Sequence, residues 1–312
     1  MPSRSHKAVL ALVLLAGAAM AQPVEQVTVT GTRDRTIMDQ YIRNFAVPTR
    51  MTGKLTRWHE GVCPQVVGMK PEFAGFVARR IRAVAAETGA PVGAESCRTN
   101  IQVVFTTTPQ ALMDDVRKHQ PDYLGYADGP SARDALAKVT RPIQAWYSTA
   151  TRDLYGQVEI DGQKTMGTTA DFNAPPPPPS GGIGMGGPPP HMELPYARVV
   201  QVTGMRLGDG VSSELHHVII VADPSKLADR EIGELADYVA MLSLTQLASL
   251  EVCQPLPSIV NLLVKDCPRP SSTLTDNDLA YLKGLYSMGP ERNARVQADQ
   301  IGYFMQEHLV GK

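Results

Sequence analysis

The sequence predicts an α+β fold with one main hydrophobic core. Segments with helical periodicity and short apolar stretches follow one another in the order helix, strand, helix, strands, helices. Hydrophobic residues make up 43% of the 312 residues, which is enough for a sizeable core. The charged fraction of 20% is ordinary and argues against a disordered chain.

The N-terminus predicts a signal peptide over residues 1–21. Arg4 and Lys7 are followed by an apolar run over residues 8–19, and Ala19-Met20-Ala21 fits the small-residue cleavage rule, which places Gln22 first in the mature chain. The alternative is an N-terminal anchor helix, against which the short run argues. We expect a secreted or periplasmic protein with no membrane span in the mature chain.

The elements expected next begin with an extended N-terminal arm over residues 22–50, because residues 24–32 alternate between apolar and polar side chains. A single domain over residues 51–312 follows. Pro71 and Gly89 suit the first turn and the C-terminal cap of a helix over 71–87. The further expected elements are a strand at 100–105, a helix at 109–119, strands at 143–149, 197–205 and 215–221, and helices at 232–250, 274–286 and 296–309.

A Pro- and Gly-rich insertion over about residues 156–195 interrupts the domain, and residues 174–191 include a run of five Pro. Such a composition is typical of polyproline II structure beside a flexible hinge. The insertion either docks a protein partner through residues 174–191 or is a tolerated surface insertion.

The four cysteines predict two disulfides, because an even count suits an oxidising compartment. Four cysteines allow three connectivities. We favour Cys63–Cys97 and Cys253–Cys267, since each pair flanks one local unit. The second pair closes a loop of about 15 residues, which stabilises by roughly 3 kcal/mol in the chain-entropy model.

The helix predicted after strand 215–221 reads ADYVAMLSLTQ from Ala236 to Gln246. The C-terminal half resembles a zincin metallopeptidase of the metzincin type, in which a cleft-edge strand precedes a helix carrying H-E-x-x-H-x-x-G-x-x-H. On that motif Ala236 and Ala240 stand at two His positions, Asp237 replaces the general-base Glu, Ser243 the Gly, and Gln246 the third His. The resemblance implies that strand 215–221 edges a cleft and that the helix bends or ends near Ser243.

Two further segments carry the same resemblance. Residues 258–261 resemble the turn that contains Met in that family, with Val260 in place of Met, and residues 274–286 resemble the closing helix, entered through Thr275 with Asp278 three residues later. The layout also resembles secreted proteobacterial domains of unknown function. The implied fold is a zincin-like mixed sheet with a long cleft helix and C-terminal helices.

The departures from the motif bear on the chemistry. A catalytic zinc needs three protein ligands, alanine has no ligand atom and Gln is a poor one, so the resemblance implies a degenerate site without metal or cofactor. Asp237 stays a candidate functional acid, or else lies on an exposed polar face. His217 is a second, weak candidate. Adjacent strand residues point to opposite faces, so His216 and His217 cannot chelate one ion together, but one of them could line the cleft.

The leading hypothesis is therefore a secreted, non-catalytic binding or structural protein on a degenerate zincin-like scaffold, a pseudo-metallopeptidase. The alternatives are a secreted hydrolase or metal enzyme with an unrecognised site, and an envelope accessory protein that docks through the Pro-rich insertion. Residues 1–21 hold two of the 30 Lys and Arg residues and none of the 31 acidic ones, so the mature chain is slightly acidic and nucleic acid is not an expected partner.

The first prediction concerns export. Protein recovered from the secreted or periplasmic fraction begins at Gln22, because cleavage follows Ala21. N-terminal mass analysis measures this directly, and a chain that retains Met1 contradicts it.

Overall fold

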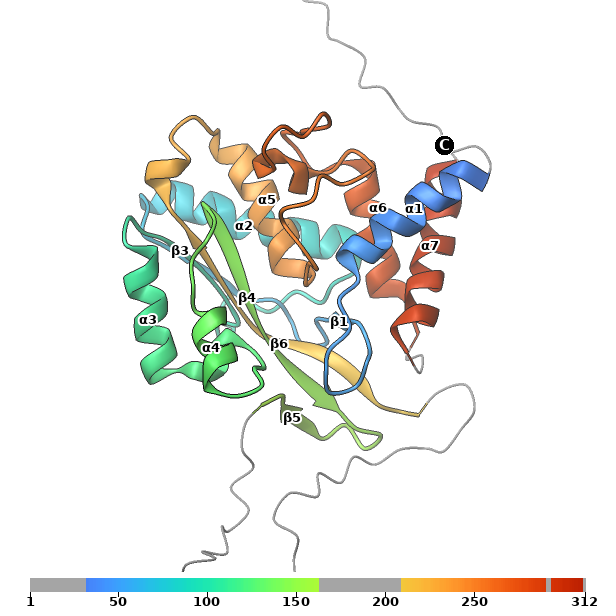
Figure 1. Cartoon of the computed structure of the whole chain (residues 1–312), viewed down its shortest axis with the longest axis horizontal. Helices are drawn as coiled ribbons and strands as arrows, with labels where there is room; N and C mark the ends of the chain where they lie inside the picture. Colours follow the sequence, from blue (N-terminus) through green and yellow to red (C-terminus); the bar gives the residue numbers. More distant parts are fainter. Residues whose placement is uncertain (1–31, 163–208, 290–292, 311–312) are drawn as a thin grey trace, which may run out of the picture.

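One mixed sheet organises the chain (Figure 1). The computed structural model describes residues 32–162, 209–289 and 293–310, and in these residues six strands form this sheet. Their order is β2 (Pro64–Val67), β3 (Ile101–Phe105), β6 (Ser212–Ala222), β4 (Ile143–Arg152) and β5 (Val158–Ile160), and β1 (Thr56–Arg57) also pairs with β6. The β1, β2, β3 and β6 pairings are parallel, whereas β4 runs antiparallel to β6 and β5. The prediction of an α+β fold is confirmed.

Strand β6 lies in the middle of the sheet, so the expectation that strand 215–221 edges a cleft is wrong. It pairs with β3 on one side and along its whole length with β4 on the other. The cause is visible in the sequence LHHVIIV, because Val218 and Ile220 are buried on one face while Ile219 and Val221 are buried on the other. A strand covered on both faces reads as a continuous apolar run.

Helices cover both faces of the sheet (Figure 1). Helices α2 (Pro71–Thr88) and α5 (Ile232–Leu244) pack on the face that carries Val218 and Ile220. The opposite face is covered by α3 (Pro109–His119) and the 3₁₀ turn η1 (Pro121–Leu124), beside which lies α4 (Pro130–Leu136). The C-terminal helices α6 (Asp276–Ser287) and α7 (Ala294–Val310) pack on one another and extend the first layer.

Most predicted helices are confirmed within a few residues, but helix 232–250 ends at Leu244. Gly89 closes α2 with a φ of 84°, a left-handed conformation that glycine adopts without strain. Thr275 caps α6, and its side chain accepts from the Asp278 amide while the Asp278 carboxylate accepts from the Thr275 amide.

The expected extended arm over residues 22–50 is wrong from residue 32 onward, where the chain forms α1 (Thr32–Phe45). The helix forms because Met38, Tyr41, Ile42 and Phe45 recur at spacings of three and four, and all four side chains are buried in the core cluster that also holds residues of α6 and α7. The apolar–polar alternation that suggested the arm falls in residues 24–31, which lie outside the described part of the chain.

The insertion begins later than expected. Residues 158–160 form β5, which pairs with Ala150–Arg152 of β4 at the end of a hairpin. From residue 163 on, the expected insertion, including residues 174–191, lies outside the described ranges, and so does the whole strand expected at 197–205. A short 3₁₀ turn, η2 (Pro224–Lys226), follows β6, and another, η3 (Ile259–Leu263), precedes α6.

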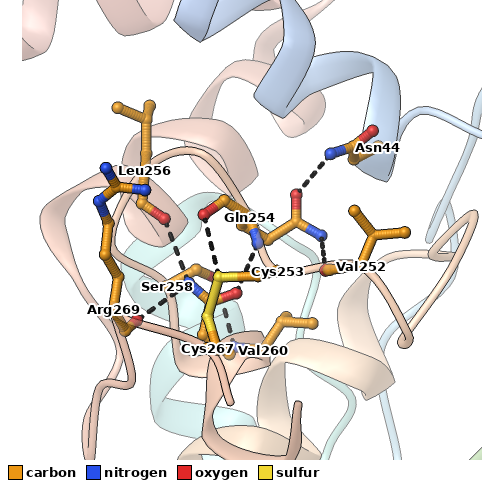
Figure 2. Close-up of a disulfide and its surroundings, with 10 residues drawn as sticks. Asn44, Val252, Cys253, Gln254, Leu256, Ser258, Val260, Cys267 and Arg269 are labelled. Atoms are coloured by element: carbon orange, nitrogen blue, oxygen red, sulfur yellow. Dashed lines mark hydrogen bonds between the residues drawn. A yellow bond between two sulfur atoms is a disulfide. The ribbon is translucent and has the colours of Figure 1, made fainter. Parts of the chain in front are cut away.

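Both predicted disulfides are confirmed, Cys63–Cys97 with a Cα–Cα distance of 5.9 Å and Cys253–Cys267 with 5.5 Å. Figure 2 shows the second pair in the loop between α5 and α6. Gln254 beside it accepts from the Asn44 side chain of α1, and its amide donates to Asn261 Oδ1. The disulfide therefore belongs to a polar cluster that holds the long α5–α6 loop against the N-terminal helix.

The carboxylate of Asp278 joins three separate segments. It accepts from Tyr41 Oη of α1 at 2.8 Å, from Ser258 Oγ and the Ile259 amide at the start of η3, and from the Thr275 amide and hydroxyl at the cap of α6. Asp278 has no exposed surface. Burial raises the pKa of this carboxyl, and the donors from Ser258, Thr275, Ile259 and Tyr41 oppose the rise.

The second prediction is that Asp278→Ala destabilises the protein by about 3–5 kcal/mol, because it leaves several buried donors without an acceptor. The matched control is Asp276→Ala in the same helical turn, an exposed acid whose loss costs about 1 kcal/mol or less through the helix dipole. Urea unfolding of both variants measures the difference. Equal losses of stability contradict the central role of Asp278.

Candidate functional site

Two of the residues on the zincin-like motif lie in the closed core. Ala236 and Ala240 share one face of α5 and have no exposed surface. Asp237 on the same helix is also buried, and it does not face a cleft. Its carboxylate is paired with the Arg80 guanidinium of α2 and accepts from the Leu274 amide at 3.0 Å. Asp237 therefore connects α2, α5 and the segment that leads into α6.

The end of α5 is built by three aromatic side chains that satisfy its last carbonyls. Tyr147 Oη donates to the Leu242 oxygen at 3.0 Å, Trp58 Nε1 to the Ser243 oxygen at 2.8 Å, and Tyr286 Oη to the Leu244 oxygen at 2.7 Å. A helix terminus leaves such carbonyls without intrahelical partners, so these bonds define where α5 stops. Thr245 then takes an extended conformation with a φ of −148°.

Gln246 lies beyond the end of α5 and lines a groove of about 340 Å³. The groove lies between residues 47–51, which follow α1, residues 124–126 at the end of η1, and the outer side of β4. Its lining consists of these two segments together with Leu136, Ala145, Trp146, Tyr147, Thr149, Asp161, Gln246 and Leu247. Gln246 Oε1 is buried and has no hydrogen-bond partner among the described residues.

The groove follows the outer edge of β4. Strand β5 pairs only with Ala150–Arg152. Within the described ranges, therefore, no strand covers the outer edge of β4, the edge away from β6, between Ile143 and Thr149. The Asp223 amide donates to the Pro142 oxygen, which fixes the alternation of the β4–β6 ladder. In an antiparallel pair the residues that do not bond the partner strand direct their backbone groups outward, so Ala145 and Tyr147 direct theirs toward the groove.

Two contacts cover part of this edge of β4. Asp161 covers the edge beyond Thr149, where its amide donates to the Thr149 oxygen and its carboxylate accepts from the hydroxyls of Thr149 and Thr151. Gly125 lies against the Tyr147 carbonyl, and a Cβ atom there would come within 2.3 Å of that oxygen. Ala145 lies two residues before Tyr147 on the same edge and lines the groove, and its backbone groups have no hydrogen-bond partner among the described residues.

His217 lies apart from the groove, on the sheet face covered by α3 and η1. Its ring stacks on Tyr123 with 4.2 Å between ring centroids, and its Nδ1 is buried without a described partner. Ser148 stands directly opposite on β4, and its Oγ is also buried and unpartnered. Burial lowers the pKa of His217 to about 4. His217 and Asp237 do not meet at one site.

Comparisons with protein-family models, with curated proteins and with solved structures find no significant match for this chain. Among the described residues no group of three or more His, Cys, Asp or Glu side chains is placed to hold a metal ion. No helix in the described ranges is both long and apolar enough to cross a membrane.

The third prediction concerns the pH dependence of stability. With a native pKa near 4 against 6.5 for the free side chain, the unfolded chain binds a proton at His217 before the native protein does. Stability therefore falls as the pH falls from 6.5 to 4, by up to about 3 kcal/mol from this residue.

His217→Phe keeps the stack on Tyr123 and removes the titrating group, so its stability declines less over this range than that of the wild type. Tyr123→Phe is the control, because it leaves His217 buried and should retain the wild-type slope. Urea unfolding at a series of pH values measures both. A parallel decline in wild type and His217→Phe contradicts the assignment.

Proposed function

We propose that this protein is an exported, non-catalytic binding protein that takes up an extended peptide in the groove beside β4. The observation that carries the proposal is the outward-facing backbone of Ala145, set in a groove together with the buried, unpartnered Oε1 of Gln246. Both features call for a ligand that donates and accepts backbone hydrogen bonds.

An extended peptide has that chemistry. A residue placed opposite Ala145 in an added strand exchanges two hydrogen bonds with it, and such strand addition is a recurring mode of peptide recognition. Rotation of the Gln246 side chain into the groove would bring its Oε1 to a further peptide amide, which satisfies an acceptor that is otherwise costly to bury. The remaining lining near Ala145 is mostly apolar, with Leu136, Trp146 and Leu247, and suits uncharged peptide side chains.

The helix residues support a role without zinc hydrolysis. The resemblance to zincins assigns two metal ligands to the positions of Ala236 and Ala240, which carry methyl groups in the core. The acid between them, Asp237, is occupied by Arg80 and Leu274. We retain a degenerate zincin-like scaffold as part of the proposal, supported by the end of α5 at Leu244 and by the Thr275 cap of α6; the central position of β6 is a departure from it.

Export is supported by the N-terminal sequence and by the two disulfides, which are typical of oxidising compartments. Docking of a protein partner through residues 174–191 stays a prediction from composition, because that segment lies outside the described residues.

The fourth prediction tests the groove. A phage-displayed library of random dodecapeptides is selected on the mature protein, and enriched peptides are measured by fluorescence anisotropy. Ala145→Pro removes an amide that no ladder bond uses and places a ring in its path. We expect about tenfold weaker binding or more, the loss that corresponds to one or two hydrogen bonds.

Ala145→Ser retains the amide and is the matched control, with affinity close to that of the wild type. Gln246→Leu tests the second contact without altering a strand and should also weaken binding. Melting temperatures show that each variant is folded. Failure to enrich any peptide, or unchanged affinity in both Ala145→Pro and Gln246→Leu, overturns the proposal.

A further inference from the structure

The Cys63–Cys97 disulfide has a guanidinium beside both sulfur atoms. Arg82 on α2 places Nη2 at 3.2 Å from Cys97 Sγ and at 3.9 Å from Cys63 Sγ. The same side chain is held in place by the carbonyl oxygens of Gly93, at 2.7 Å from Nη1, and Ala94, at 3.4 Å from Nη2. A positive charge fixed at this distance stabilises a thiolate on either cysteine.

The second disulfide has the opposite surroundings. The Cys253 sulfur contacts the carbonyl oxygen of Gln254 at 3.7 Å, and this oxygen carries partial negative charge. Figure 2 shows the side chain of Arg269 extending toward Leu256 and away from the two sulfur atoms. Both cysteines of this pair are half-buried, whereas in the first pair Cys97 is half-buried and Cys63 is buried, so exposure alone does not favour reduction of the first pair.

The segment that carries Cys97 is open to solvent, while the backbone around Cys63 is held without help from the disulfide. Residues 94–96 are exposed and Cys97 is half-buried. Asn100 accepts from the Cys63 amide at 2.7 Å through its side chain, and its own amide donates to the Cys63 oxygen. These bonds and the β2–β3 ladder do not involve the sulfur atoms, so they are available to hold the sheet when the sulfur–sulfur bond is broken.

We propose that Cys63–Cys97 is a thiol–disulfide exchange site that an external dithiol reduces in preference to Cys253–Cys267. A thiolate of the dithiol attacks Cys97 Sγ, which forms a mixed disulfide and releases Cys63 as a thiolate beside Arg82. The second thiolate of the dithiol then attacks its own sulfur in the mixed disulfide and releases Cys97 as a thiolate. The protein disulfide gains two electrons, and the dithiol is oxidised to a disulfide.

The first test is limited reduction of the folded mature protein with dithiothreitol, followed by alkylation and peptide mass analysis. We expect Cys63 and Cys97 to be alkylated well before Cys253 and Cys267. Arg82→Met slows reduction of the first pair by at least about threefold, because a leaving thiol of higher pKa leaves more slowly. Arg82→Lys retains the charge and stays closer to the wild type. Simultaneous reduction of both pairs, or an unchanged rate in Arg82→Met, overturns the proposal.

The second test separates charge from packing. In Cys63→Ser the Cys97 thiol is free, and its alkylation by iodoacetamide at neutral pH reports how readily it ionises. We expect this rate to fall at least about threefold when Arg82→Met is added, and to be largely retained with Arg82→Lys. If Arg82 has a purely structural role, Arg82→Met and Arg82→Lys change the alkylation rate of Cys97 equally. Equal alkylation rates in the two double variants therefore count against the exchange site.

Discussion

The buried carboxylate of Asp278 is the interaction on which the C-terminal half of the fold depends. A carboxylate taken out of water is tolerated only when hydrogen-bond donors replace the lost solvent, and here those donors come from α1, from the start of η3 and from the cap of α6. Each of these segments is distant in sequence from at least one other. Placing Asp278 therefore positions the N-terminal helix and the α5–α6 loop together, and the aromatic rings of Tyr41, Phe45 and Tyr281 pack beside it.

The same half of the molecule shapes the groove indirectly. The bonds of Tyr147, Trp58 and Tyr286 to the last carbonyls of α5 end the helix beside β4, and Gln246 emerges at that point. Residues 47–51 form the facing wall because α1 ends at Phe45, whose side chain is anchored in the Asp278 region. The groove is thus a consequence of where two helices stop, rather than of a cluster of reactive side chains.

Sequence patterns predicted the elements whose signal is local. The Pro71 start and Gly89 cap of α2, the Thr275 cap of α6 and both disulfide pairings follow from short-range chemistry. The position of β6 did not, because a resemblance suggested an edge, whereas the apolar run on both faces already favoured a central strand. Helix α1 did not follow either, because the apolar–polar alternation just before it favours an extended arm.

The groove could not be predicted from the sequence, for a different reason. Ala145 contributes only backbone atoms, and the exposure of those atoms depends on which strands are its neighbours. No motif encodes that property. Likewise, Asp237 lies neither in a cleft nor on an exposed face, and periodicity alone does not specify the packing of the elements that carry its partners Arg80 and Leu274.

The central position of β6 also has a consequence for how the chain is made. Ile101 pairs with Val218 and Tyr147 with the same residue from the other side, so the middle of the sheet is supplied by a segment synthesised long after its two neighbours. Until that segment arrives, β3 and β4 have no common partner, and each presents an open edge to other chains. A nascent chain crossing a membrane from its N-terminus would emerge in this order, and sheet closure waits for pairings of long sequence separation, which form slowly. The stage before β6 is available for pairing is therefore the one at which the chain is most prone to aggregate.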